Sequence, residues 1–554
     1  MKARARLAGL RDSRSNEGGY VAVVTAILLI VLMGLAAFAV DVGHWYVVGQ
    51  QEQRAADAAA MAGVTFLPGN PDAAKTTAQS YSRINGFTTG ANQTTITSTI
   101  DGRSTRLRVK VDRTVTNFFG SLLHVPSTTI SRSAVADFAG PVPMGSPCNE
   151  FGNDPDPESN RGNACAGVLG EMWANVNSPS SAKGNGDAYQ SDTGCSSSVD
   201  GCTGTTNNDY TADGYYYTIS VKAAMPSLTV QLFDPVWVNT GLTCDTNFSS
   251  GGTAATAARN DVVSDETTRY KANTTGSTPF YSPYCTGDND YSGSQVMNTQ
   301  FTVRDPGASP WDTATFPVHA GCQKTYPGYT GTLFNVLNKG DSKYNGAIVD
   351  GFRRWTTLCT IPNPAVGDYL IQVKSNVGGL ANNANAGNRF AIRAYGSAAG
   401  DKEALQIYGR EKMGIYSNKP GVTTEFHLAR VPTLAAAQIL RVRLFDVGDS
   451  SISGTIKIIY PPDALGGPFT GCVGTLSTGS PVSLTNCSLT VNTSTHNGKW
   501  QSVSVPIPAN YSCTDADNTK CWVRLQYVYG SGSVPTDVTA WTASIEGDPV
   551  RLVE

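Results

Sequence analysis

An uncharged apolar segment near the start of the chain constrains its architecture more than any other feature. Residues 18–40 read GGYVAVVTAILLIVLMGLAAFAV and contain no acidic or basic side chain. About 20 apolar residues in a helix suffice to cross the hydrocarbon core of a bilayer, so this segment predicts a transmembrane helix. The residues before it carry more cations than carboxylates: Lys2, Arg4, Arg6, Arg11 and Arg14 against Asp12 and Glu17. Because basic flanks stay on the cytoplasmic side, we expect a single-pass cell-membrane protein with residues 1–17 in the cytoplasm and the rest outside it.

A cleaved signal peptide is the alternative to a permanent anchor. The tripeptide Ala37-Phe38-Ala39 has the small-x-small form of a signal-peptidase site. However, the apolar part of a signal peptide is usually about 7–15 residues long, which is shorter than residues 18–40. An uncleaved transmembrane helix is therefore the preferred interpretation.

The cysteines support an exported location, because all 12 lie after residue 140 and none is in the anchor. An even set confined to one side of a membrane span is typical of disulfides formed in an oxidising compartment. Metal binding is the alternative, but the chain has no Cys-x-x-Cys motif and its histidines are scattered. Pairing between sequence neighbours closes the shortest loops, for example 195–202, 472–487 and 513–521. The predicted disulfide cysteines are Cys148, Cys165, Cys195, Cys202, Cys244, Cys285, Cys322, Cys359, Cys472, Cys487, Cys513 and Cys521.

The helical pattern continues beyond the apolar segment. Residues 41–63 lack proline and are rich in alanine, which is the best helix former. Small side chains at positions 55, 56, 58, 59, 60 and 62 permit close approach of another element. That element is either a partner helix or the next domain of this chain, and a simple stalk is the remaining interpretation.

Residues 17–63 resemble a known family. The marks are Asp41-Val42-Gly43, the aromatic pair Trp45-Tyr46, and the run AADAAAMAG at residues 55–63. This pattern is similar to the N-terminal region of the TadG-like family of Flp (tight adherence) pilus-assembly proteins, and the similarity extends more loosely to residue 140. The resemblance implies that pilus or secretion-system components are partners. Prepilins carry a Glu at the fifth position after their cleaved Gly, where this chain has Val23 and Val24, so processing as a pilus subunit is not expected.

The exported part is predicted to be mainly β. Residues 41–140 read as a membrane-proximal helix and a small α+β module. Residues 141–398 and 399–554 then show short alternating strands between Gly/Asn/Ser/Thr-rich loops, which is typical of β-sandwiches or jelly rolls. We therefore expect two disulfide-braced β-sandwich domains. The segments LTVQLFD at 228–234 and LRVRLFD at 440–446 share their alternation and their ending, which indicates either an internal duplication or a chance similarity between strands.

The chain shows no motif that predicts catalysis. The five histidines stand apart, and no Gly-x-Ser-x-Gly, His-Glu-x-x-His or phosphate-binding loop is present. Asp449, Ser451 and Ser453 have the Asp-x-Ser-x-Ser spacing of a metal site, but a strand pattern follows instead of a helix, so a hairpin turn is predicted. Asp288, Asp290 and Ser292 match the first half of a calcium loop, although Thr299 stands where the bidentate Glu is expected. Calcium is the one cofactor that the sequence leaves open.

These features predict a non-enzymatic, membrane-anchored protein of Flp/Tad pilus assembly or surface adhesion. The alternative is an envelope protein that binds carbohydrate, or hydrolyses glycan, through tyrosine-rich faces at 215–217, 281/284 and 527/529. The expected partners are the lipid bilayer, pilus or secretion components and, for the alternative, cell-surface glycans. A net charge of −3 with 15% charged residues offers no attraction for nucleic acid.

Overall fold

The computed structural model describes residues 17–67, 71–101, 106–138, 142–153, 172–192, 194–239, 286–290, 296–307, 312–330, 335–336, 339–377, 385–417, 423–476, 479–530, 532–533, 535–546 and 550–553. The chain divides into two compact units. The N-terminal unit comprises Met1–Leu67, Asp72–Phe138 and Val550–Glu554, and the β unit comprises Pro68–Pro71 and Ala139–Pro549. The predicted class, mainly β with an apolar N-terminal helix, is confirmed.

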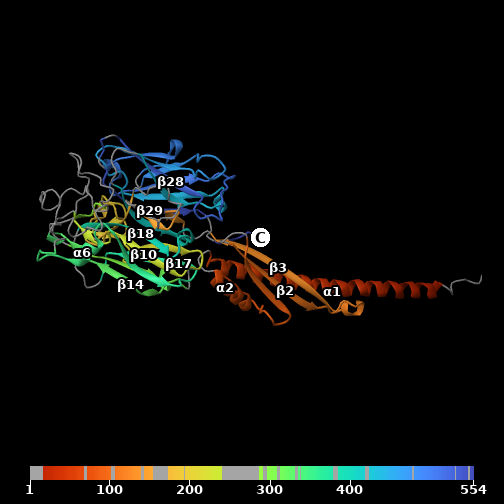
Figure 1. Ribbon diagram of the computed structural model, residues 1–554. Coiled ribbons are helices and arrows are strands. Elements are labelled where there is room, and N and C mark those ends of the chain that lie inside the picture. Colours follow the sequence, from red (N-terminus) through yellow and green to blue (C-terminus); the bar gives the residue numbers. More distant parts are fainter. Residues whose placement is uncertain are drawn as a thin grey trace, which may run out of the picture. The chain divides into compact units, whose positions relative to one another are not determined.

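One uninterrupted helix, α1 (Glu17–Val64), carries both the apolar segment and the alanine-rich segment. Its N-terminal part, long and apolar enough to cross a membrane, is not buried against any other element. In Figure 1 this part of α1 extends past the neighbouring strands, and its C-terminal part runs alongside β2 and β3. The predicted span and the predicted helix after it are thus parts of one continuous helix.

The alanine-rich segment packs on the sheet of its own unit. The sheet has the order β1–β2–β3–β30, formed by Thr94–Ile100, Arg106–Thr116, Ser127–Phe138 and Val550–Leu552. Ala55, Ala56, Ala59 and Ala60 are fully buried in one core with side chains of β2 and β3. Their small size lets the helix lie close to the strands. Of the interpretations left open by the sequence, packing against the next domain is the one the structure shows.

A second helix, α2 (Pro71–Ile84), approaches α1 at a glycine. Pro71 occupies its first turn, where a missing N–H costs nothing, and Gly86, with φ of +89°, follows its end. A Cβ atom at Gly63 of α1 would lie 2.5 Å from the carbonyl oxygen of Ala74 and 2.5 Å from a Leu107 methyl group. Only glycine allows this contact between the two helices and the sheet.

The last strand of the chain belongs to the N-terminal unit. β30 pairs antiparallel with β3, with Ala136 opposite Leu552 and Phe138 opposite Val550. Along the chain, the β unit therefore lies between β3 and β30, which are neighbouring strands of one small sheet. The sequence assigned residues 550–552 to a C-terminal sandwich because three residues carry no pattern that distinguishes one sheet from another.

Two large antiparallel sheets build the β unit. One has the order β16–β10–β18–β6–β20–β29–β22–β27–β24–β25, with β5 and β12 also paired to β18, and the other has the order β14–β13–β17–β9–β19–β4–β21–β28–β23–β26. Their bounds are β4 Pro143–Gly145, β5 Glu150–Phe151, β6 Trp173–Asn177, β9 Tyr215–Val221, β10 Ser227–Phe233, β12 Asn289–Asp290, β13 Thr299–Arg304, β14 Val318–Tyr326, β16 Trp355–Pro362, β17 Gly367–Lys374, β18 Ala386–Gly396, β19 Leu405–Arg410, β20 Lys412–Ser417, β21 Thr423–Arg430, β22 Ile439–Phe445, β23 Gly454–Ile459, β24 Val473–Leu476, β25 Val482–Ser483, β26 Ser488–Val491, β27 Trp500–Pro506, β28 Trp522–Tyr529 and β29 Asp537–Ile545.

The strand orders of the two halves correspond. In the first sheet β16–β10–β18 matches β27–β22–β29, and in the second β14–β13–β17–β9 matches β26–β23–β28–β21. The halves are interleaved, because β19 of the second half lies beside β9 and β4 of the first half lies beside β21. Both sheets therefore run through both halves, and one core cluster includes Val230 and Val442. The predicted boundary at residue 398 falls between β18 and β19.

The Leu-Phe-Asp ends of segments 228–234 and 440–446 lie at equivalent turns of this duplicated fold. Asp234 and Asp446 have φ values of 52° and 61°, a conformation that Asp tolerates better than most residues. The Asp234 carboxylate accepts the backbone N–H of Arg353 at 2.9 Å, and the Asp446 carboxylate accepts that of Gly498. The repeated aspartate is thus a structural corner, and the repeated segment reflects a repeated fold.

Four disulfides between sequence neighbours brace the described part of the β unit. They are Cys195–Cys202, Cys322–Cys359, Cys472–Cys487 and Cys513–Cys521. Three of these are the short-loop pairings named from the sequence. Cys148 is also disulfide-bonded, and Cys165, Cys244 and Cys285 lie outside the described residues.

Candidate functional site at the end of the apolar helix segment

Asp41, the first charged residue after the apolar segment, holds a loop of the same unit. The loop, here called the hairpin tip, comprises residues 117–126 between β2 and β3 and contains a short 3-10 helix, Gly120–Leu123. The carboxylate of Asp41 accepts the backbone N–H of Phe118 at 2.7 Å, of Phe119 at 3.1 Å, and of Gly120 at 2.7 Å. Only 3% of Asp41 is exposed, so these three donors take the place of water around its carboxylate.

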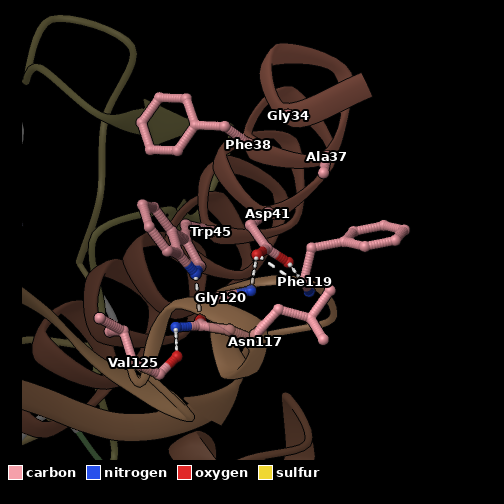
Figure 2. A pocket seen from close by; sticks show the side chains of 10 residues that line it. Gly34, Ala37, Phe38, Asp41, Trp45, Asn117, Phe119, Gly120 and Val125 are labelled. Atoms are coloured by element: carbon pink, nitrogen blue, oxygen red, sulfur yellow. Dashed lines mark hydrogen bonds between the residues drawn. The ribbon is translucent and has the colours of Figure 1, made fainter. Parts of the chain in front are cut away.

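Trp45 makes the second contact of the helix with the hairpin tip. Residues four apart lie on one face of a helix, so Asp41 and Trp45 both point at the loop (Figure 2). The indole Nε1 of Trp45 donates to Asn117 Oδ1 at 2.8 Å, and Asn117 Nδ2 donates to the carbonyl oxygen of Val125 at 2.9 Å. The two ends of the tip are thereby fixed to the helix and to each other.

The backbone amides of residues 118–120 and the Asn117 side chain face the helix, whereas the large apolar side chains of the hairpin tip are exposed. The exposed fractions are 63% for Phe118, 42% for Phe119, 79% for Leu122 and 50% for Val125. A hollow of about 230 Å³ separates the tip from the helix and is lined by Gly34, Ala37, Phe38, Asp41, Trp45, Asn117, Phe119, Gly120, Leu122 and Val125. Figure 2 shows Phe38, Trp45 and Phe119 around this hollow.

A buried carboxylate lies further along α1. Glu52 is fully buried against the sheet, and neither of its carboxylate oxygens has a hydrogen-bond partner in the described part of the chain. Burial raises its pKa from 4.5 to about 7, an effect that Arg113 and Arg132 oppose. Sequence reasoning missed Glu52, because a Glu among Gln50, Gln51 and Gln53 reads as an exposed helix face.

Of the three predicted calcium residues, the structure describes the side chain of Asp288 only. Asp288 is buried, and its two carboxylate oxygens accept the backbone N–H groups of Arg389 at 2.8 Å and Val238 at 3.2 Å. Burial and the neighbouring Asp234 carboxylate raise the pKa of Asp288. The side chain of Asp290 and all of Ser292 lie outside the described residues, so calcium binding here stays a prediction.

The other ligand-type groupings have structural explanations. Among the described residues, Cys513, Asp515 and Cys521 form the one cluster close enough to share a metal ion. Its sulfurs are joined in a disulfide, which leaves no thiolate to act as a ligand. Asp449 lies between β22 and β23, which belong to different sheets, so the predicted hairpin turn is wrong and the segment is a connection from one sheet to the other. Burial beside Asp537 raises the pKa of Asp449 to about 7.

The histidines show no paired nucleophile within the described residues. His319 Nδ1 lies 2.7 Å from Asp305 on the β13–β14 hairpin, and no hydroxyl or thiol of the described chain is bonded to its ring. His427 stacks edge-on with Trp522, and burial and Arg524 lower its pKa to about 4. It is therefore neutral near pH 7.

The tyrosine-rich segments contribute to the core. Tyr215, Tyr217, Tyr527 and Tyr529 are buried, and Tyr215 donates to the carboxylate of Asp187 at 2.6 Å. These four residues are therefore core side chains and do not form an exposed glycan-binding face. Tyr281 and Tyr284 lie outside the described residues.

The helix and the two units together define a class of protein. One candidate membrane helix continues without a break into a small α+β unit, and a large disulfide-braced β unit accompanies it. Within the described residues, this is the class of β proteins with one candidate membrane helix.

Comparison with known proteins then identifies the N-terminal region. Residues 19–70 match the family described as putative Flp pilus-assembly TadE/G-like, so the predicted resemblance is confirmed. The match covers the apolar segment, Asp41, Trp45 and the buried alanines, and it ends at the start of α2. The N-terminal region of the chain is thus similar to Tad pilus-assembly proteins, and the match includes the candidate membrane helix. No curated protein and no solved structure matches the chain.

Proposed function

We propose that this protein is a non-enzymatic, membrane-tethered factor of Tad pilus assembly or surface adhesion. Its N-terminus lies in the cytoplasm, α1 crosses the membrane, and the β unit is presented outside. The observation that carries the proposal is that the family-matched segment forms a single helix joining an apolar span to a buried alanine face. A continuous helix rises about 1.5 Å per residue. The alanine face, and with it the N-terminal unit, is therefore held at a fixed distance from the bilayer.

Covalent chemistry and charge support the proposed orientation. Four disulfides in the described part of the β unit favour an oxidising compartment for that unit. The basic N-terminal residues favour the cytoplasm for the opposite end. A non-enzymatic role is supported by the structural use of the ionisable groups, since Asp234, Asp288 and Asp446 bond backbone N–H groups.

Deleting the gene and restoring it tests the proposal. We expect the deletion strain to lose surface pili, counted by electron microscopy, and to lose adherence, and the full chain to restore both. A matched strain carries Asp57→Asn, a change on the same helix at a residue that, among the described residues, bonds only the side chain of Gln53, and it should behave as wild type. Unchanged pili and adherence in the deletion strain would overturn the proposal.

Protease protection tests the orientation. In right-side-out vesicles, protease added outside should digest the β unit and leave a short N-terminal fragment. A fully protected chain would show that the orientation is reversed.

A second candidate, recognition of an envelope glycan, has one supporting observation. The β unit has a hollow of about 370 Å³ lined by Asp200, Gly201, Arg443, Thr475, Leu476, Gly479, Trp500 and Ser502. Its polar groups suit sugar hydroxyls, but Arg443 lies 4.4 Å over the Trp500 ring and covers the face on which a sugar would stack. Titration of the detergent-solubilised chain with cell-wall glycan fragments tests this candidate. Binding that Arg443→Ala alters would favour it, and no heat of binding would reject it.

A further inference from the structure

We propose that the hairpin tip, residues 117–126, is a membrane-docking element that inserts its apolar side chains into the bilayer interface beside α1. The partner is the lipid itself, its acyl chains and glycerol region. The inference rests on the proposed function only in that residues 18–40 span the bilayer.

The composition and exposure of the tip fit a lipid-facing surface. The tip reads NFFGSLLHVP and has no acidic residue, lysine or arginine. Phe118, Phe119, Leu122 and Val125 are between 42% and 79% exposed in one loop. A group of large exposed apolar side chains marks an interaction surface, and no described element of the N-terminal unit covers this one.

The position of the tip along α1 sets it at the membrane boundary. The hollow between tip and helix is lined on the helix side by Gly34, Ala37 and Phe38, which lie inside the apolar segment. Residues 34–41 cover about 10 Å of helix at 1.5 Å per residue. The tip also bonds Asp41 and Trp45, and Phe118 contacts the His44 ring, so the tip lies beside the end of the span and the first turn after it. When the last turns of the span are in hydrocarbon, the exposed side chains of the tip are at the membrane interface.

The polar contacts of the site explain how the tip tolerates that depth. In hydrocarbon every backbone donor needs an internal partner, and the first three amides of the tip after Asn117 donate to the Asp41 carboxylate. Trp45, an amphipathic residue of the type enriched at membrane interfaces, has its Nε1 bonded to Asn117. The tip thus presents four large apolar side chains outward and pairs the backbone amides of residues 118–120, while Ser121 and His124 are its exposed polar side chains.

A membrane helix of a second protein is the competing occupant, and lipid is favoured on geometry. The most exposed side chains, Phe118 and Leu122, project from the end of a loop, whereas a helix docks in a groove. The hollow holds about 230 Å³, enough for part of an acyl chain but not for a helix of about 10 Å diameter. Lipid tails also adapt to an irregular surface.

The experiment measures depth with a fluorophore on the full chain in lipid vesicles. A single free cysteine is introduced by Leu122→Cys and labelled with an environment-sensitive dye, because all other described cysteines are in disulfides. The vesicles contain phosphatidylcholine and phosphatidylglycerol, some carrying a doxyl quencher near the headgroup end of the acyl chain. The matched control is Ile84→Cys on α2 of the same unit, where the side chain is 70% exposed. A second control, Leu29→Cys, reports on the span itself in vesicles whose doxyl quencher is near the methyl end of the acyl chain, because position 29 lies at the middle of the span.

We expect lipid-borne quencher to reduce the emission at position 122 by about threefold or more, since interfacial groups sit about 5–10 Å deep. Emission at position 84 should be unaffected by the lipid-borne quencher and reduced by iodide in the water. Equal behaviour at 122 and 84, with 29 quenched by lipid, would overturn the inference and leave the anchor intact. If the probe at position 29 is not quenched, residues 18–40 do not span the bilayer, and the proposed function fails as well. If the probe at position 122 is protected from iodide in native membranes but not in pure lipid vesicles, the occupant is a protein partner and the lipid proposal is overturned.

Discussion

Replacing Asp41 by Asn should release the hairpin tip while leaving the rest of the N-terminal unit folded. The Asp41 carboxylate accepts three backbone N–H groups, and its two shortest contacts, with Phe118 and Gly120, are both 2.7 Å. The amide of Asn has one acceptor oxygen and turns an N–H₂ group toward one of these donors. At least one short bond to a charged group is lost.

The size of the effect follows from the kind of bond. A hydrogen bond to a charged group contributes about 1.5–3 kcal/mol net. Because the Asn side chain still accepts one of the donors, we expect a local loss of about 2 kcal/mol. Since 1.4 kcal/mol is a factor of ten, that loss corresponds to amide exchange about thirtyfold faster in the tip.

Hydrogen–deuterium exchange of the full chain in detergent micelles measures this loss directly. Peptides covering residues 117–126 should exchange faster in Asp41→Asn, whereas peptides from β1 should not change. The control Asp57→Asn removes a carboxylate whose one hydrogen-bond donor is the Gln53 side chain, and it should leave the tip as in wild type. Equal protection of residues 118–120 in both variants would refute the argument that Asp41 holds the tip.

Three further predictions concern stability. The pKa of Glu52 is raised from 4.5 to about 7, so the contribution of this group to stability is most favourable below pH 4.5 and falls as the pH rises from 4.5 to about 7; Glu52→Gln should remove this dependence and add up to about 3 kcal/mol at pH 8, measured by denaturant titration of the full chain with a probe in the N-terminal unit. Gly63→Val should destabilise the unit by about 1–3 kcal/mol through overpacking, seen as a lower unfolding midpoint in thermal melts. Replacing Cys322 and Cys359 by Ser opens a 37-residue separation and should cost the β unit about 4 kcal/mol in the loop-entropy model, read from calorimetry.

Matched controls separate these effects from general damage. Gly43→Ala places a Cβ in open space and should stabilise the helix slightly, which contrasts with Gly63→Val. The Ser replacement of Cys195 and Cys202 opens a separation of only seven residues and should cost about 1.5 kcal/mol less than the loss of Cys322–Cys359. A pH-independent midpoint in the wild-type chain, or equal costs for the two disulfides, would contradict the respective reasoning.

Local sequence patterns predicted much of the architecture. The anchor follows from residues 18–40 alone, since an uninterrupted apolar run needs no tertiary partner to be recognised. Strands such as Ile439–Phe445 follow from alternation, and the short-loop cysteine pairs follow from proximity along the chain. The resemblance of the N-terminal helix to the pilus-assembly family was likewise predicted from residues 17–63 alone.

Tertiary structure alone decided which distant residues meet. Asp41 bonds amides more than 70 positions away, β30 returns to a sheet begun more than 400 residues earlier, and β4 and β19 are interleaved between the halves. Glu52 is buried because the sheet lies against that side of the helix. Hydrophobic periodicity reports only which face of an element is covered, and a hydrogen bond between remote segments leaves no local trace. The sequence therefore determined the anchor and the kinds of elements, and the packing of those elements determined the site.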